Sequence, residues 1–272
     1  MKTQHVLKRA RWPIAIAFAL LVTNAFSAAS WADEPKKTDD WEFAVNPYVW
    51  FLFLDGDITV KGQTQRASAK FGDIFQDINF AVMVEAEARK GRVGGFVNTI
   101  FGALGDDKTV QGVKLDVSVD LLYVGFGAYY RLGPWALEDA PGDEGATLTV
   151  DPYVGGRYTY IDTKVDVVGI ETIKDNVDWI DPILGVRTLW DLSERWSIDA
   201  AADIGGFGAG SDFTWHAFGL IGYRFNLFGE RDARVLVGYR ALYQDYEKGS
   251  GASKFEWDVT VHGPVLTLNI EF

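Results

Sequence analysis

The feature that most restricts the fold of this 272-residue chain is an alternation of apolar and polar side chains with a period of two residues. Successive side chains of a β-strand point to opposite faces, so this period predicts strands rather than helices. A short helical turn is expected only at Phe71–Ile78. We predict an all-β fold whose strands lie at residues 41–54, 79–90, 93–104, 112–131, 147–162, 176–190, 195–208, 212–227, 233–246 and 255–272.

These ten segments are long for a soluble protein, in which a strand typically has about five or six residues. In the segment 212–227, Trp215 and Phe225 share one face and are separated by about 33 Å of extended chain. At a tilt of about 40° this length spans roughly 25 Å, the height of the apolar band of a membrane barrel. We therefore predict an antiparallel up-and-down transmembrane β-barrel of ten strands, with eight or twelve strands as alternatives.

The first residues of the chain have the pattern of a secretory signal peptide. A basic start with no acidic residue precedes the apolar run 13–22, and the small residues Ser30 and Ala32 follow at the positions that a signal peptidase reads. The apolar run is shorter than the roughly 20 residues of a membrane-spanning helix. We expect residues 1–32 to be cleaved, residues 33–40 to form a short periplasmic segment, and residues 41–272 to form the barrel.

The charge and composition of the mature chain exclude some classes of function. The formal net charge of the whole chain is -12, and it becomes -16 when the four basic residues of the signal peptide are removed. An acidic chain is a poor partner for nucleic acid. The chain has no cysteine and therefore no disulfide. We expect no nucleic-acid partner and no cofactor, and we expect the exported protein to contact membrane lipid.

The last ten residues continue the alternation to the end of the chain. Leu268, Ile270 and Phe272 share one face, and an unpaired strand of this kind would promote aggregation. In a closed barrel the last strand pairs with the first, so no free edge remains. A terminal aromatic residue after alternating apolar residues also resembles the signal that the outer-membrane assembly machinery recognises. The resemblance implies that Leu268, Ile270 and Phe272 form an assembly signal and that this machinery is a partner.

Five segments resemble a group of small, largely uncharacterised outer-membrane β-barrel proteins of Gram-negative bacteria. These segments are WEFAVNPYVW (41–50), EARKG (87–91), GGFGAGSD (205–212), GYRALYQDY (238–246) and HGP (262–264). The resemblance covers nearly all of the mature chain. It implies a barrel in the cell outer membrane, and it implies almost nothing about a biochemical activity.

Charged residues occupy the faces that we assign to the inside of the barrel. Acids and arginines are nearly balanced there, and all six basic positions are arginine, which favours fixed bidentate pairing over a hydrated channel wall. We predict an ion-paired interior and a structural or interaction role, with a narrow channel for small solutes as the alternative. The predicted interior residues are Glu85, Glu87, Arg89, Asp116, Asp120, Asp151, Arg157, Asp181, Arg187, Asp199, Asp203, Arg224, Arg234 and Arg240.

The pattern D-P-x-x-G-x-R occurs at residues 151–157 and again at residues 181–187, on two consecutive strands. Asp and Arg are six residues apart in each copy and therefore face the same side. A hairpin centred on Gly169 would place Asp151 opposite Arg187 and Arg157 opposite Asp181. The repeat thus predicts two ion pairs from one register, because a slip of one residue would turn these charges toward lipid.

The barrel rules also predict which ends of the strands face outward. With the N-terminus in the periplasm, ten strands return the C-terminus to the periplasm. The longest outward segment, 55–78, is the best candidate for contact with an unidentified partner. The segment 133–146 is long for a periplasmic turn. We expect β-bulges at the prolines inside strands, and the apolar alternation changes its parity at one of them. These prolines are Pro47, Pro152, Pro182 and Pro264.

The sequence contains no strong catalytic pattern. His216 and His262 are the only histidines left after signal removal, and His216 lies four residues from Asp212. We expect His216 to be hydrogen-bonded to this carboxylate near the outer rim. No Ser-His-Asp order and no metal-ligand spacing stand out. We therefore predict no catalytic, cofactor or metal site and no enzymatic activity, with an outer-membrane hydrolase as a distant third alternative.

We expect the exported protein to begin at or near Asp33, because the small residues before it form the cleavage site. N-terminal sequencing of protein purified from the outer membrane measures this directly. A mature protein that retains residues 1–32 would contradict the signal-peptide prediction.

Overall fold

The computed structural model describes residues 40–110, 113–137, 146–167, 171–227 and 231–272, without the side chains of residues 106–110, 113–117, 165–167, 171–173, 227 and 231. Its elements are β1 (Trp41–Trp50), β2 (Phe53–Val60), β3 (Gln63–Ala69), α2 (Phe71–Asp77), β4 (Ile78–Lys90), β5 (Val93–Val110), β6 (Val113–Tyr130), β7 (Leu132–Ala136), β8 (Thr147–Val167), β9 (Glu171–Asp191), β10 (Trp196–Gly206), β11 (Phe213–Leu227), β12 (Arg231–Lys248), a 3-10 turn (Gly251–Ser253) and β13 (Phe255–Glu271).

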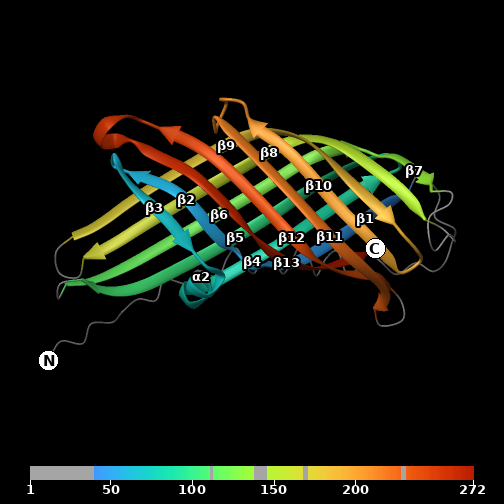
Figure 1. Cartoon of the computed structure of the whole chain (residues 1–272), viewed down its shortest axis with the longest axis horizontal. Coiled ribbons are helices and arrows are strands. Elements are labelled where there is room, and N and C mark those ends of the chain that lie inside the picture. Colours follow the sequence, from blue (N-terminus) through green and yellow to red (C-terminus); the bar gives the residue numbers. More distant parts are fainter. Residues whose placement is uncertain (1–39, 111–112, 138–145, 168–170, 228–230) are drawn as a thin grey trace. The chain divides into compact units, whose positions relative to one another are not determined.

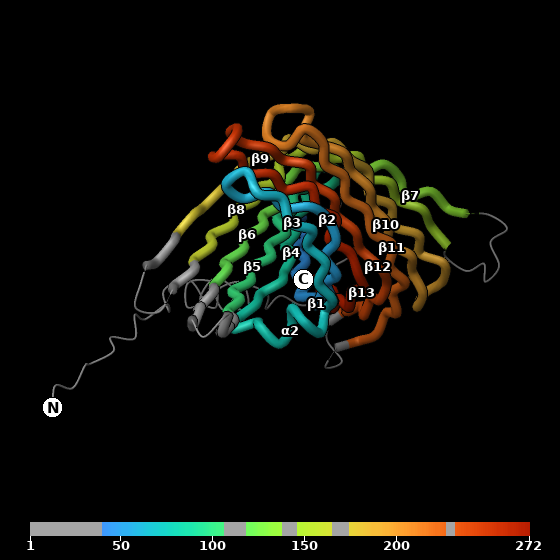
Figure 2. The backbone as a smooth tube through the Cα atoms, turned by 60° about the vertical axis from the view of Figure 1, so that its left-hand side comes forward, coloured from blue at the N-terminus to red at the C-terminus, as the bar shows by residue number. Residues whose placement is uncertain are grey.

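Ten of these strands form a closed antiparallel barrel, as the sequence predicted (Figures 1 and 2). Their order is β1-β4-β5-β6-β8-β9-β10-β11-β12-β13, and β13 pairs with β1 to close the ring. The last residue takes part in this seam, because the N–H of Phe272 donates to the carbonyl of Phe43 at 2.9 Å. The strand-like C-terminus therefore has a partner, and the first and last strands leave no free edge between them.

The outside of the barrel is apolar over the half in which β1 begins and β13 ends, which we call the terminal half. Val154, Leu184, Ile221 and Val237 lie on four different strands and are each more than half exposed on this outer surface. Such a continuous exposed apolar surface is typical of a barrel that is embedded in lipid. On the opposite face of the same strands, charged side chains such as Asp151, Asp181 and Arg234 are buried inside the barrel.

The alternation inverts toward the opposite end, which we call the far half. Along β9, Ile180 is exposed and Asp181 is buried, whereas Asp178 is exposed and Trp179 is buried. Toward the far half, the apolar side chains of the strand therefore move from the outer face to the inner face, although the pleat itself does not change. We infer that the boundary of the lipid lies at this level, because beyond it the outer face meets water and the inner face forms a core.

The far half separates into two facing sheets. The β10–β11 hairpin ends at Gly206 and Phe213, while β9 continues paired only with β8, and β12 continues paired only with β13. On the other side, β4 begins opposite Leu104, and β5 continues beyond it paired with β6 alone. One sheet therefore contains the ends of β5, β6, β8 and β9, and the other contains β12, β13, β2 and β3.

An apolar core fills the space between these two sheets. Trp179 of β9 stacks on Tyr246 of β12 with ring centroids 4.2 Å apart and an interplanar angle of 7°. Buried Ile161 and Val177 belong to the same cluster, and further side chains from both sheets pack against it. Those packing residues are Val119, Leu121, Phe255 and Trp257. The far half of the interior is therefore a packed core rather than a hydrated lumen.

Several expectations about strand boundaries were wrong. Residues 55–78 contain β2, β3 and α2 in place of a loop, although the helical turn was placed correctly. Strand β5 extends into the range 105–111, and β8 and β9 extend into the range 163–175, although both ranges lay between the predicted strands. Part of the long turn is strand β7, which pairs with β8, and residues 138–145 lie outside the described residues. The far half explains the errors in the ranges 55–78, 105–111 and 163–175, because strands that leave the membrane continue into the two-sheet core.

The four strand prolines do not form β-bulges. Pro47 pairs with Val84, and Pro264 pairs with Tyr239, within uninterrupted registers. Pro152 and Pro182 likewise keep their places in the β8–β9 ladder. All four rings lie on the exposed face, and each removes a single backbone donor. The change of apolar parity near Pro264 has another cause, because it marks the inversion between the far half and the terminal half.

No helix among the described residues is long and apolar enough to cross a membrane.

We expect Trp179→Ala to lower the free energy of unfolding by about 3–5 kcal/mol, because it removes a buried ring from the core between the two sheets. Ile180→Ala is the matched control on the adjacent exposed position, and we expect a much smaller loss there. Urea unfolding in detergent micelles, followed by tryptophan fluorescence and by the gel mobility of the folded form, measures both. Equal losses for the two variants would contradict the two-sheet core.

Candidate functional site in the barrel interior

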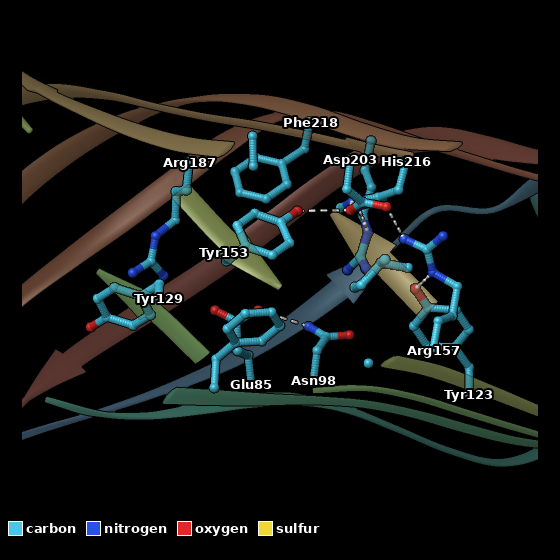
Figure 3. Close-up of a pocket in the computed structure, with 15 residues that line it drawn as sticks. Glu85, Asn98, Tyr123, Tyr129, Tyr153, Arg157, Arg187, Asp203, His216 and Phe218 are labelled. Atoms are coloured by element: carbon cyan, nitrogen blue, oxygen red, sulfur yellow. Dashed lines mark hydrogen bonds and ion pairs between the residues drawn. The ribbon is translucent and has the colours of Figure 1, made fainter. Parts of the chain in front are cut away.

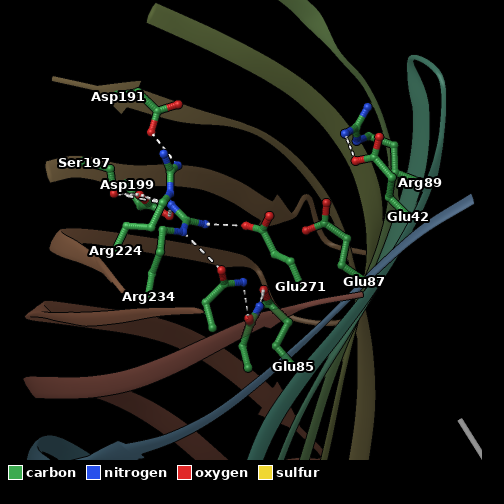
Figure 4. A network of polar contacts seen from close by, with 12 residues as sticks. Glu42, Glu85, Glu87, Arg89, Asp191, Ser197, Asp199, Arg224, Arg234 and Glu271 are labelled. Carbon is green, nitrogen blue, oxygen red and sulfur yellow. Dashed lines mark hydrogen bonds and ion pairs between the residues drawn. The ribbon is translucent and has the colours of Figure 1, made fainter. Parts of the chain in front are cut away.

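Ion pairs and hydrogen bonds line the rim of the terminal half (Figure 4). Arg89 is paired with Glu42, and Arg224 lies 3.1 Å from Asp191. These four residues come from β4, β1, β11 and β9; β4 and β1 are neighbours in the ring, and one strand, β10, lies between β11 and β9. The side chains at this end form a charged layer in which acids and arginines are matched.

Arg234 of β12 is the centre of a second rim group (Figure 4). Its guanidinium lies 3.2 Å from Asp199 of β10 and 3.7 Å from Glu271 of β13. The same side chain donates from Nε to Asn269 at 3.1 Å. A planar guanidinium with five N–H donors suits such a site, because it satisfies acceptors on several strands at once.

Deeper in the barrel, Arg187 connects two carboxylates. It donates from Nη1 to Glu87 at 2.6 Å and from Nη2 to Asp151 at 3.0 Å, and it lies over the ring of Tyr129. Asp151 receives two further hydrogen bonds from Arg131 at 3.0 and 2.8 Å. The Tyr129 hydroxyl donates to Glu87. This group is a network in which each carboxylate has at least two donors.

The structure has the strand register that the repeated D-P-x-x-G-x-R pattern predicted. Asp151 is the partner of Arg187, and Arg157 is the partner of Asp181 in the β8–β9 ladder. The first pair forms the predicted ion pair at 3.0 Å. The prediction of the second ion pair was wrong, because Arg157 turns to Asp203 on β10. Register fixes which side chains start opposite each other, and a long arginine can still reach a different strand.

Asp203 and Arg157 form the most buried ion pair of the interior. Their side chains are 2% and 1% exposed. Arg157 also donates from Nε to the Tyr123 hydroxyl at 2.7 Å and from Nη1 to Thr214 at 2.9 Å. The Tyr153 hydroxyl donates to Asp203 at 2.8 Å. A buried ion pair is stable only when such additional hydrogen bonds satisfy the remaining donors and acceptors.

His216 is part of the same buried group, and its predicted contact with Asp212 was wrong. Its Nδ1 lies 3.0 Å from Asp203, and its Nε2 lies 2.9 Å from Nε of Arg240. Arginine Nε can only donate, so His216 Nε2 must be the acceptor, and the ring proton must lie on Nδ1. His216 is therefore a neutral imidazole that donates to Asp203.

Asp181 binds neutral donors in place of its expected arginine. Its side chain accepts hydrogen bonds from Ser211 N at 2.6 Å, from the Ser211 hydroxyl at 2.9 Å and from Trp179 Nε1 at 3.2 Å. Gln244 Nε2 lies 3.5 Å away. These contacts fix the tip of the β10–β11 hairpin above the ionic interior and directly below the apolar core.

A cavity of about 60 Å³ lies in the middle of this polar interior (Figure 3). Figure 3 shows Arg187 and Tyr129 on one side of it and Asp203, His216 and Arg157 on the other. Glu85 and Arg240 also line it. This volume is enough for about four to six water molecules. The cavity is therefore a small space lined by charged, aromatic and apolar side chains.

One predicted interior residue, Asp120, does not face the interior. Asp120 is six residues from exposed Phe126 on the same strand and therefore shares the outer face with it. Leu121, the next residue, packs toward the interior core. The reason is the inversion of the far half, where charges face outward. The side chain of Asp116 lies outside the described residues.

Sequence reasoning missed the neutral and aromatic members of the network. Tyr48, Asn98, Tyr123 and Tyr153 all make buried side-chain hydrogen bonds. Tyr153 lies two residues from Asp151 on the same strand, and this even spacing was the signal that could have placed it inside. Tyr123 lies three residues from Asp120 on its strand, so the charged residues there gave no such signal. Arg131 is the last residue of the predicted strand 112–131, and it was missed because it lies an odd number of residues from Asp116 and Asp120, which were assigned to the interior.

The three residues of the expected assembly signal follow the β13 alternation. Asn269, between Leu268 and Ile270, is buried and receives the contact from Arg234. Leu268, Ile270 and Phe272 alternate with it and belong to the outer face. Their placement fits lipid contact, and their recognition during assembly stays a prediction.

No family model matches the sequence, and no curated protein matches it. Solved structures similar to this fold include that of Ail, the attachment invasion locus protein of Yersinia pestis, in complex with the heparin analogue sucrose octasulfate (TM-score 0.36, 10% identity, 86% of this chain and 99% of that chain). Neisserial surface protein A has a TM-score of 0.32 and 11% identity over 88% of this chain and 100% of its own. A Pseudomonas aeruginosa FadL homologue has a TM-score of 0.29 and 9% identity over 85% of this chain and 89% of its own. These are outer-membrane barrels of Gram-negative bacteria, the class that the sequence resembles.

We expect Arg187→Met to lower the free energy of unfolding by about 3–5 kcal/mol, because it leaves a buried carboxylate without its cation. Adding Glu87→Gln should recover more of this loss than adding Asp151→Asn, because Asp151 keeps the two hydrogen bonds from Arg131. Two double-mutant cycles in micelles measure the couplings. A coupling near zero between Arg187 and Glu87 would contradict the network.

Proposed function

We propose that this chain is an integral outer-membrane β-barrel with a structural or interaction role, whose interior offers no continuous path across the membrane and whose outer surface contacts lipid. The observation that carries the proposal is the filling of the far half by the apolar core between the two sheets. In the terminal half, ion pairs narrow the interior to a small cavity.

The chemistry of the interior supports a scaffold more than a channel. A channel for polar solutes needs a continuous hydrated wall that releases its solute again. Trp179 and Tyr246 stack face to face in the far half and offer no polar lining there. The six interior arginines that the sequence predicted each donate to neighbouring side chains, which leaves few sites for a passing ion.

The location and partners follow from the sequence together with the fold. We propose that the signal peptide directs the chain out of the cytoplasm and that the terminal aromatic segment is read by the outer-membrane assembly machinery. The terminal end of the barrel then faces the periplasm, and the two-sheet far half projects from the cell surface. The β2–β3 hairpin is the part of that projection best placed to contact a surface partner.

We propose that the protein is not an enzyme. His216 is fully engaged by Asp203 and Arg240 inside the barrel, so it is not available as a base at the surface. His262 lies on the outer face with Tyr239 and Asp55, where the ring stacks on Phe53. Stacking and partial exposure fit a residue of the aromatic belt at the membrane boundary.

We expect the refolded wild-type protein to show no steady conductance in a planar bilayer, because the apolar core fills the far half of its interior. Heat-modifiable migration on gels confirms that the recorded sample is folded, and reconstitution of a known open porin under the same conditions is the positive control. Steady, ion-selective single-channel steps from the wild type would contradict the scaffold and favour the narrow channel.

A further inference from the structure

The charged side chains around the central cavity are not all paired with each other. Arg157 is matched by Asp203, and Arg187 is matched by Glu87. Arg240 and Glu85 remain, and both line the cavity. Over the described residues, no ion pair of 4.0 Å or less joins Arg240 to a carboxylate or Glu85 to a basic group. The cavity therefore has one positive and one negative group whose protein partners are neutral.

Arg240 is held rigidly by partners that do not neutralise it. Its Nε donates to the neutral His216 ring, and its Nη1 donates to the Tyr48 hydroxyl at 3.1 Å. The guanidinium also lies over the Trp50 ring, 4.9 Å from the centroid. Arg240 Nη2 makes no hydrogen bond to any residue that the structure describes. Every fully buried side-chain nitrogen or oxygen atom of the described residues has a hydrogen-bond partner, so Nη2 is not fully buried. Nη2 is therefore a donor with access to the cavity.

Glu85 has a corresponding arrangement of opposite sign. Its two carboxylate oxygens accept from Asn46 at 3.3 Å and from Asn98 at 3.1 Å. Both donors are neutral amides, so the negative charge of Glu85 is hydrogen-bonded and not cancelled. A carboxylate oxygen accepts more than one hydrogen bond, so acceptor capacity remains on the side of the cavity.

A chain of neutral side chains keeps these two charges apart. The Tyr48 hydroxyl receives a hydrogen bond from Arg240 and donates to Asn98 Oδ1 at 2.9 Å, while Asn98 Nδ2 donates to Glu85. Direct pairing of Arg240 with Glu85 would break this chain. The wall thus holds a guanidinium and a carboxylate at fixed, separate places on one small cavity.

Solvent reaches the cavity from the terminal end. Arg187 on that side is 22% exposed, whereas Arg157 farther in is 1% exposed. Beyond Asp181 the apolar core closes the interior. A solute would therefore enter past Arg187 from the terminal end and could not continue to the far end.

We propose that the cavity is a binding site for a small zwitterion, with its carboxylate on Arg240 and its ammonium group on Glu85. The complementary charges select a molecule that carries both signs and is neutral overall. The volume of about 60 Å³ limits it to about five non-hydrogen atoms, the size of the smallest amino acid. A lone anion would meet the carboxylate of Glu85, and a lone cation would meet the guanidinium of Arg240.

Glycine is the probe for this site, with acetate and methylammonium as its two single-charge halves. Isothermal titration calorimetry on the folded full-length mature protein in micelles measures the three affinities. Nitrogen NMR of the Asn98 side-chain amide and the His216 ring reports whether binding takes place in the cavity. We expect glycine to bind and to shift these signals, and acetate and methylammonium to bind about tenfold more weakly or worse.

Glu85→Gln is the test variant, because an amide keeps the size of the side chain and removes its charge. We expect it to weaken glycine binding about tenfold or more. Arg224→Gln at the exposed rim is the matched control, and it should leave the affinity unchanged. Absence of glycine binding to the wild type overturns the proposal, and so does equal binding of acetate and glycine. If Glu85→Gln does not fold, the affinities of the wild type for glycine, acetate and methylammonium still test the proposal.

Discussion

A strand in lipid must find a partner for each of its backbone N–H and C=O groups, and the contact of β1 with β13 determines whether this chain meets that requirement. Ala44 to Trp50 pair with Glu271 to Val265 along this seam, and the terminal residue adds its own hydrogen bonds to Phe43. Because the ring closes, the barrel encloses a space that water would otherwise fill. The ionic interior and the apolar core occupy that space, so both depend on the pairing of β1 with β13.

The strands serve two environments in succession, and this explains why they are so long. In the terminal half a strand faces lipid outside and buried charges inside, whereas in the far half it faces water outside and an apolar core inside. The pleat continues unbroken through both environments. Only the residue types on its two faces are exchanged, as they are between Asp178 and Asp181. A sequence pattern that changes parity is therefore not by itself a sign of a bulge. Here it marks the level at which the chain leaves the membrane.

The sequence was sufficient to predict the barrel and its ten strands, because the period of two residues, the length of the strands and the signal-peptide pattern agree. The repeated D-P-x-x-G-x-R pattern was sufficient to predict the register of β8 with β9. It was not sufficient to predict which partner each interior side chain selects. Arg157 starts opposite Asp181 and binds Asp203, and His216 binds Asp203 instead of Asp212. Asp120 was misplaced because its strand had already entered the far half. Such choices depend on distances across the interior, which have no signature in the sequence.

The contacts across the interior explain how a barrel without disulfides holds its cross-section. Arg187 on β9 reaches Glu87 on β4, and Arg240 on β12 reaches Tyr48 on β1, so these side chains join strands that are not neighbours in the ring. Ladder hydrogen bonds resist separation of adjacent strands but permit the ring to flatten. A chord between distant strands resists flattening, and a planar guanidinium bonded at several points resists rotation as well. Arginine is therefore suited to this interior for its geometry as much as for its charge, and the same rigidity holds the free side of Arg240 in place at the cavity.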